Sequence, residues 1–336
     1  MKKYYPIFVS KSGEFTALKK LSQQIKDDIS PIIEVIPNNY DRVLNFATNE
    51  WSFIDNELYL DFSLCSPYDD NETKRLTEEL ISNQINVIPV VGKNSHLNYL
   101  TYIKTLFSQS KINKICFRLN NGEIPTSNID HEIDLLLNII GTNRKSLSLI
   151  LDFGIVGQQN YLTFAIECIS IIETLQNNLS SIIVSCGSFP QNLSSFTPPN
   201  RLYTIKRYEW LFWLELQKHT EIRKLISYSD FGTKFPTYTE ASFPGTCSIK
   251  YTTELEFLIY RGELSRLHRL GNGQFIEFAS QLISNQKYYG RNFSWGDDRI
   301  FTIASQLNSL DQTPGNLETW VQISQNHHIT LIHNLL

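Results

Sequence analysis

The sequence predicts an α/β protein, a TIM-like (β/α)8 barrel with a C-terminal extension over the barrel mouth. Eight short apolar runs alternate with helical patterns at intervals of about thirty residues, as βαβ units do. Three of these runs end on Asp-Phe, at Asp61-Phe62, Asp152-Phe153 and Asp230-Phe231. A strand buried on both faces reads as a nearly continuous apolar run. We therefore expect these carboxylates at the carboxyl edge of the sheet, where such folds place their sites.

The expected elements follow the chain in order, with strands at residues 4–10, 32–36, 58–64, 85–91, 114–119, 146–153, 181–186 and 225–231. Between them, apolar residues recur at three- and four-residue spacing, which predicts helices at 14–29, 40–51, 71–83, 97–107, 129–140, 161–175 and 208–218. The count of eight strands favours a closed barrel. An open doubly wound sheet is the structural alternative, because periodicity does not establish closure.

After residue 232 the composition changes. Residues 233–245 contain two prolines and several threonines and predict a long loop over the barrel mouth. Residues 249–261 have strand or helix potential, and 275–285 carry a helical pattern. We therefore expect a barrel over residues 1–232, with a lid loop and a C-terminal extension over 233–336 packed on it.

The bulk properties indicate a cytoplasmic protein. The net charge of −4 and the pI near 6.0 argue against a surface designed broadly for nucleic acid, so a nucleic-acid partner is open but unsupported. No run approaches the roughly 18 apolar residues that span a bilayer, and the N-terminus lacks the apolar core of a signal peptide. Five scattered cysteines without a CxxC pair predict buried free thiols in a reducing compartment.

Charged residues at the expected strand ends are the first candidates for catalysis: Glu34, Asp61, Arg118, Asp152 and Asp230. In a barrel they converge on one face, and an isolated buried charge is very costly, so they must be paired, hydrated or bound to metal. The four carboxylates would suit Mg²⁺ or Mn²⁺, with Arg118 free to hold a phosphate. The structural alternatives are an ion-pair network or caps of the following helices.

Other candidates come from later segments. His327 and His328 are adjacent, so they point in different directions and are not expected to ligate one metal together, although one could act as an acid or base. Arg207 and Glu209 are candidate ligand contacts or a pair on a helix surface, with the surface pair favoured. Lys250 and Arg261 are candidate anion contacts from the extension.

Several segments, in order along nearly the whole chain, resemble the Beta protein family of satellite phages and bacterial genomic islands. They are Tyr5-Pro6-Ile7, Gly13-Glu14, Pro31-Ile32-Ile33-Glu34, Arg207-Tyr208-Glu209-Trp210, Ser229-Asp230-Phe231-Gly232, Tyr251-Thr252, Gly315-Asn316, Trp320 and Asn326-His327-His328-Ile329. The resemblance implies a component of a phage-defence cassette that acts beside a toxic or effector partner. It assigns no catalytic residues.

Three functions follow as hypotheses. The first is a regulatory protein of an anti-phage module, similar in logic to a toxin–antitoxin pair, which controls a neighbouring effector or toxin by sensing a ligand at the barrel mouth. The second is a metal-dependent phosphodiesterase or nuclease that uses the carboxylates at the mouth. The third is a barrel whose polar mouth is structural only. The fold alone does not separate them, because this barrel hosts many functions.

Overall fold

The computed structural model describes residues 4–52, 56–65, 69–124, 128–176, 178–193, 198–240 and 245–336. The chain divides into two compact units, each described here by itself. The barrel unit comprises residues 1–11, 27–187 and 208–231, and the second unit comprises 12–26, 188–207 and 232–336. The second unit thus takes in two segments that precede the last barrel strand. Residues 241–244 of the expected lid loop lie outside the described residues.

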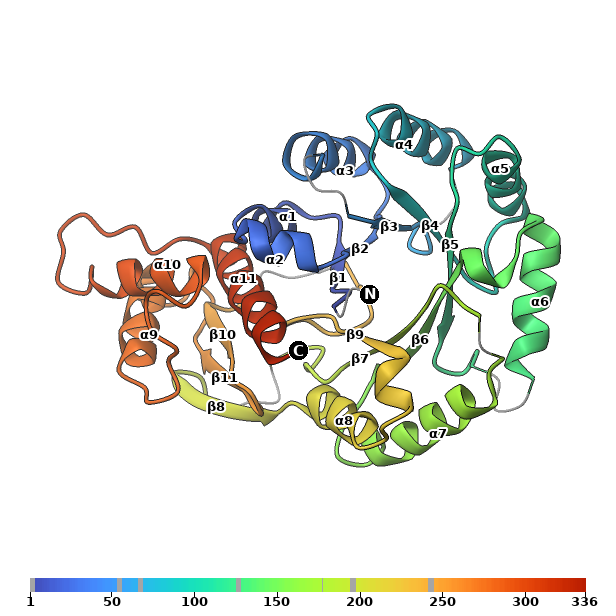
Figure 1. Cartoon of the computed structure of the whole chain (residues 1–336). Helices are drawn as coiled ribbons and strands as arrows, with labels where there is room; N and C mark the ends of the chain where they lie inside the picture. Colours follow the sequence, from blue (N-terminus) through green and yellow to red (C-terminus); the bar gives the residue numbers. More distant parts are fainter. Residues whose placement is uncertain are drawn as a thin grey trace. The chain divides into compact units, whose positions relative to one another are not determined.

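The barrel unit contains eight parallel strands in the order β1-β2-β3-β4-β5-β6-β7-β9 (Figure 1). The strands are β1 Ile7–Val9, β2 Ile32–Glu34, β3 Leu58–Asp61, β4 Val87–Val91, β5 Ile115–Asn120, β6 Leu147–Ile155, β7 Ser181–Gly187 and β9 Ile226–Ser229. A parallel bridge joins Tyr4 to Tyr228, and the Tyr5 amide donates to the Tyr228 carbonyl at 2.9 Å. The last strand therefore meets the first, which confirms the predicted TIM-like barrel over the open sheet.

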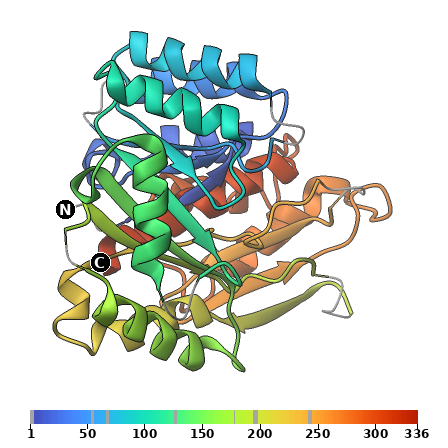
Figure 2. The same cartoon turned by 90° about the vertical axis from the view of Figure 1, so that its right-hand side faces the viewer.

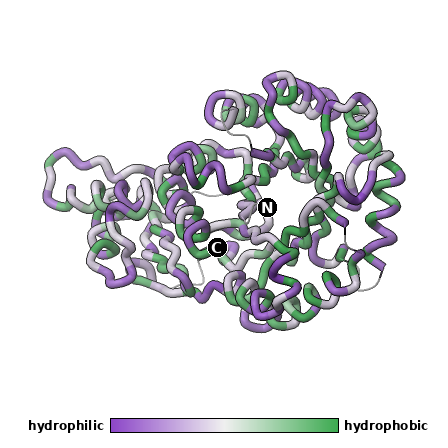
Figure 3. The backbone as a smooth tube through the Cα atoms, in the orientation of Figure 1, coloured by the Kyte–Doolittle hydropathy of each residue, from purple (hydrophilic) through white to green (hydrophobic). Residues whose placement is uncertain are grey.

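Helices surround these strands on the outside, as two perpendicular views show (Figures 1 and 2). They are α3 Tyr40–Phe46, which continues as a π-helical turn Ala47–Trp51, then α4 Asp70–Ser82, α5 Leu97–Ser108, α6 Ile129–Ile140, α7 Tyr161–Thr174 and α8 Tyr208–Gln217. Apolar residues concentrate along the strands (Figure 3). This segregation follows from burial of the strands on both faces, one towards the helices and one towards the barrel interior.

One expected helix is divided. Residues 14–29 predict a single helix, but the structure has α1 Ser12–Lys19 and α2 Gln23–Asp28. The Ser22 hydroxyl accepts a hydrogen bond from the Ile25 amide at 3.4 Å and so competes with the helical ladder. The helical spacing of apolar residues continues across the break, through Phe15, Leu18, Leu21 and Ile25. The sequence pattern therefore did not reveal the break.

The second unit contains a three-stranded antiparallel sheet in the order β10-β11-β8, with β8 Arg201–Lys206, β10 Ser248–Thr252 and β11 Glu256–Arg261. Its helices, besides α1, are α9 Gln274–Ile283, α10 Trp295–Ala304 and α11 Leu317–Leu335. One face of the sheet and these three helices enclose a core that includes Ile249, Leu258, Phe275, Ile300 and Trp320. Residues 249–261, ambiguous from sequence, form a hairpin, and the predicted helix near 275–285 is confirmed.

Candidate functional site

Four predicted residues meet inside the carboxyl end of the barrel. Glu34 ends β2, Asp61 ends β3, Arg118 lies in β5 and Asp152 in β6. Each lies two residues after an interior apolar or aromatic residue, namely Ile32, Tyr59, Cys116 and Ile150. Because side chains alternate along a strand, the charged groups also face the interior. The register places Glu34 directly beside Asp61.

The guanidinium of Arg118 joins the three carboxylates. Its Nη1 donates to Glu34 at 2.9 Å and to Asp61 at 2.7 Å. Its Nη2 and Nε donate to one oxygen of Asp152, at 2.6 and 3.0 Å. Four of the five guanidinium N–H groups are thus used. We call these four residues the Arg118 cluster.

The Arg118 cluster is buried and rich in negative charge. All four residues are at most 7% exposed, so solvent screens their charges little. Burial by itself lowers the pKa of Arg118, but the carboxylates of Asp152, Glu34 and Asp61 outweigh it and hold the pKa well above the usual value. Three carboxylates around one guanidinium carry a formal charge of −2 when all are ionised.

Backbone groups fix two of the carboxylates. The second oxygen of Asp61 accepts from the Ser63 amide at 2.8 Å, and that of Asp152 from the Gly154 amide at 2.9 Å. Gly154 has φ of +62°, a conformation that glycine adopts without strain. The chain therefore turns back on each carboxylate directly after the strand and orients it towards Arg118.

Asp230, the remaining carboxylate of the predicted set, has a different partner. It is 1% exposed and accepts from the Tyr4 hydroxyl at 2.9 Å. Among the described residues, no group of three or more His, Cys, Asp or Glu side chains is placed to hold a metal ion. A Mg²⁺ or Mn²⁺ site at these carboxylates, and a phosphate on Arg118, would require Arg118 to leave its three partners. Both stay predictions.

Two serines complete this layer of the barrel and were missed from the sequence. The register pairs Asp152 with Ser185 in β7, and Ser185 with Ser229 in β9. Both serines are fully buried, and neither hydroxyl has a hydrogen-bond partner among the described residues. The available signal was spacing, since Ser185 follows the interior residue Ile183 by two positions. A buried unpaired hydroxyl costs free energy and calls for an explanation.

His327 lies in α11 of the second unit, with both ring nitrogens engaged. Its Nε2 is 2.7 Å from the Thr252 carbonyl, which only accepts, so Nε2 carries a proton. Its Nδ1 is 2.7 Å from Asp297, and the ring stacks on Tyr251 at 3.9 Å between centroids. His327 is fully buried, and so is His328, whose Nδ1 is 3.0 Å from the Thr252 hydroxyl.

Arg207 and Glu209 do not lie on a helix surface. Arg207 is fully buried and donates to the carbonyls of Thr253 and Glu254 at 3.0 and 3.1 Å. It thereby fixes the turn between β10 and β11. Glu209 is 2% exposed at the start of α8, in the barrel unit. The surface interpretation is wrong because both side chains are buried, a fact that local charge spacing does not report.

Lys250 and Arg261 lie in neighbouring strands of the second unit, β10 and β11. The Lys250 ammonium donates to the Thr233 carbonyl at 3.1 Å and lies 4.5 Å from the centre of the Phe189 ring. Burial lowers the pKa of Lys250 to about 8, against an opposing effect of the Glu14 carboxylate, which itself pairs with Lys234 at 3.2 Å. Lys250 is therefore a partly desolvated cation near neutral pH.

Replacement of Lys250 by methionine tests this. Between pH 8 and 10.5 the unfolded chain binds more protons at Lys250 than the folded chain, so the lysine contributes stability that rises with pH. From pH 7 to pH 10, the free energy of unfolding of the wild type should rise by about 1–2 kcal/mol relative to that of Lys250→Met. This range is smaller than the full pKa shift implies, because Lys250 is partly exposed to solvent. Urea titrations across this pH range measure the difference. Lys218→Met, at an exposed position, should show no such trend. If the stability difference between the wild type and Lys250→Met is the same at every pH, the lowered pKa of Lys250 is contradicted.

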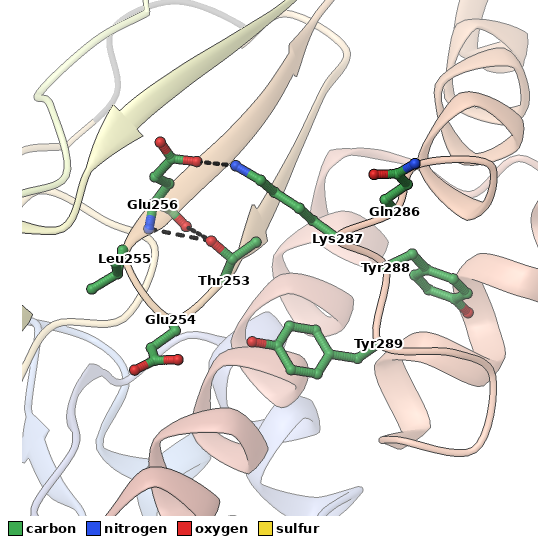
Figure 4. Close-up of a pocket in the computed structure, with 8 residues that line it drawn as sticks. All are labelled: Thr253, Glu254, Leu255, Glu256, Gln286, Lys287, Tyr288 and Tyr289. Carbon is green, nitrogen blue, oxygen red and sulfur yellow. Dashed lines mark hydrogen bonds and ion pairs between the residues drawn. The ribbon is translucent and has the colours of Figure 1, made fainter.

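An open pocket of about 480 Å³ lies in the second unit, between the β10–β11 turn and the segment before α10 (Figure 4). Its lining residues are Thr253, Glu254, Leu255, Glu256, Gln286, Lys287, Tyr288 and Tyr289. The Lys287 ammonium pairs with Glu256 across it, and the Tyr289 ring points towards Glu254 (Figure 4). None of the predicted site residues lines this pocket.

All five cysteines are buried and free, which confirms the prediction of buried thiols. Among the described residues, no helix combines the length and apolar character required to span a bilayer.

Comparison with known proteins identifies one family. No curated protein and no solved structure is significantly similar to the chain. The family model described as Beta protein matches residues 4–333, nearly the whole chain, as the sequence resemblance predicted. The chain therefore belongs to the Beta protein family.

Proposed function

We propose that this chain is a regulatory component of an anti-phage defence module in the cytoplasm. In this role it controls a neighbouring effector or toxin by sensing a ligand at the carboxyl end of the barrel. Family membership is the basis for the context. The sensing role rests on two buried hydroxyls, Ser185 and Ser229, which have no partner among the described residues and lie in the same layer as the Arg118 cluster.

The energetics of this layer favour a ligand role over a purely structural one. A barrel whose end served stability alone would gain from apolar residues at Ser185 and Ser229, because each unpaired hydroxyl costs about 1–3 kcal/mol. The excess of carboxylates over guanidinium groups also favours a ligand role. A ligand that donates hydrogen bonds could bind both the carboxylates and the two serine hydroxyls. Natural chains keep such costs mainly at functional sites.

A double variant, Ser185→Ala/Ser229→Ala, separates function from folding. It should keep or slightly exceed the wild-type free energy of unfolding, because it removes unpaired groups. Phage plating efficiency in cells that carry the whole native gene cluster should show loss of protection or loss of effector control. Unchanged protection with the double variant would show that the barrel end is structural.

The matched control lies on β6 and β7, nearer the amino end of the interior. Ser181 donates to the Ser148 hydroxyl at 2.8 Å, and Ser148 is also 3.3 Å from the Tyr59 hydroxyl. Ser148→Ala/Ser181→Ala should therefore cost about 1–2 kcal/mol of stability and leave protection intact. The two double variants thus have opposite expected effects on stability and on protection.

The metal-dependent phosphodiesterase or nuclease is the second candidate. Three carboxylates from three strands do meet at the barrel end where this fold carries its active sites. In that mechanism the carboxylates would bind Mg²⁺ or Mn²⁺, Arg118 would bind phosphate, and His327 or His328 would transfer a proton. A thermal stabilisation by Mn²⁺ that is lost in Asp152→Asn, together with phosphodiester cleavage, would favour it.

A further inference from the structure

The second unit carries three cationic side chains on one face of its sheet. The β8–β11 register places Arg201 directly opposite Arg261, and the β10–β11 register places Lys250 opposite Ile259, two residues before Arg261. Because side chains alternate, Arg201, Arg261 and Lys250 lie on the same face as Ile259. This face is opposite the one that carries Ile249 and Leu258 in the core with the helices. We call the three residues the basic face.

Arg261 lies on the central strand of the basic face, and its guanidinium has no hydrogen-bond partner among the described residues. Its Nε and Nη1 atoms are buried, and neither makes a hydrogen bond with any described residue. No ion pair joins Arg261 or Arg201 to a carboxylate within the described ranges. A guanidinium is always charged in a protein, so buried donors without acceptors carry a full desolvation cost. Buried N–H groups in this state are expected where a ligand supplies the acceptor.

The cross-strand neighbour increases that cost. Residues directly opposite in an antiparallel pair have Cβ atoms about 4.5–5.5 Å apart, and like charges there are destabilising. Arg201 and Arg261 form such a pair. Arg201 is exposed on the edge strand β8, whereas Arg261 and Lys250 are partly buried, so the basic face is open to solvent on the β8 side.

Two carboxylates of the same unit have partners outside the basic face. Glu263 accepts from the Asn200 side chain at 3.0 Å, and Glu14 pairs with Lys234. None of the three cations of the basic face forms an ion pair with a carboxylate of the described residues, although Glu14 acts on Lys250 at longer range.

We propose that the basic face binds the phosphate group of a small phosphorylated ligand. Two guanidinium groups and one ammonium carry three positive charges, which suit the two or three negative charges and the tetrahedral oxygens of a phosphate or diphosphate. Guanidinium forks bind such oxygens in pairs. A single carboxylate would leave two positive charges unbalanced. The net charge of −4 favours a small ligand over a long polyanion such as nucleic acid. This inference stands apart from the sensing role proposed for the barrel.

Titration of the intact chain with inorganic pyrophosphate tests the proposal, by calorimetry and thermal unfolding at constant ionic strength. The wild type should bind and unfold at a higher temperature with pyrophosphate. Arg261→Met should bind at least tenfold more weakly, and without ligand it should be at least as stable as the wild type, because it removes an unpaired charge and a like-charge contact. If Arg261 has only a structural role, Arg261→Met should instead be less stable than the wild type and bind pyrophosphate with unchanged affinity.

Further variants keep the test decisive. Arg201→Met, on the exposed edge strand, should also weaken binding and covers the case in which Arg261→Met does not fold. Arg269→Met removes one exposed arginine of the same unit and should bind as the wild type does. Equal losses in all three variants, or no binding by the wild type, would overturn the proposal. So would binding of a single-stranded oligonucleotide without binding of pyrophosphate.

Discussion

Replacement of Arg118 by methionine should destabilise the protein by about 3–5 kcal/mol, because it leaves three buried carboxylates without their counter-ion. All three accept hydrogen bonds from this one side chain, and none is more than 4% exposed. Methionine fills a similar volume, so the loss reports charge and hydrogen bonds more than a cavity. Urea denaturation of the purified variant at pH 7 measures the effect.

Arg75 provides a matched control with the same number of partners. On the barrel surface it pairs with Asp41, Glu72 and Glu79, and its side chain is 35% exposed. Arg75→Met should change the free energy of unfolding by no more than about 1 kcal/mol, because solvent screens exposed pairs. Similar losses in Arg75→Met and Arg118→Met would show that burial does not strengthen the Arg118 cluster.

Replacement of Asp297 by alanine should have an effect of similar size, about 3–5 kcal/mol, in the second unit. The fully buried Asp297 carboxyl accepts from the Tyr251 hydroxyl at 2.8 Å and from the Ser294 hydroxyl at 2.5 Å, and it lies 2.7 Å from Nδ1 of His327. Alanine removes a partner from the buried Tyr251 hydroxyl, the buried His327 ring and the half-buried Ser294 hydroxyl. Thermal and urea unfolding measure the loss.

Asp298, the next residue of α10, is the control for Asp297. Its side chain is 44% exposed and pairs with Arg291 at 2.6 Å. Asp298→Ala should cost less than about 1 kcal/mol, since an exposed pair contributes little. A loss in Asp297→Ala no larger than in Asp298→Ala would refute the structural role assigned to the buried network.

The barrel strands could be predicted from sequence for a physical reason. Each is buried on both faces and therefore appears as an apolar run, and all eight runs correspond to strands of the barrel. The site followed from the same logic. Glu34, Asp61 and Asp152 stand where runs stop, and parallel strands bring those ends to one edge. The sequence did not show that Arg118 pairs with these carboxylates, because the paired residues are far apart in the chain: Arg118 and Glu34 are 84 positions apart.

The three-stranded sheet was harder to predict. In β8 exposed and half-buried residues alternate, and its partner β11 begins 50 positions after Lys206. The segment from Ser188 to Arg207 lies between two barrel strands in sequence. The alternating pattern of the barrel predicted those two strands but gave no indication that this segment contains a strand of another sheet. The serines of the barrel end were missed for another reason. A serine in an apolar run gives no sign of whether its hydroxyl has a partner.

The contact between Tyr4 and Tyr228 has a consequence for synthesis on the ribosome. Because the first and last barrel strands meet there, β1 has an unpaired edge until residue 228 has left the exit tunnel. The β8 strand waits longer, for β11 at residues 256–261. Unpaired edges are templates for aggregation, and contacts between distant residues form slowly. The nascent chain therefore carries unpaired strand edges until its last third is being translated, and chaperone demand should persist to that stage.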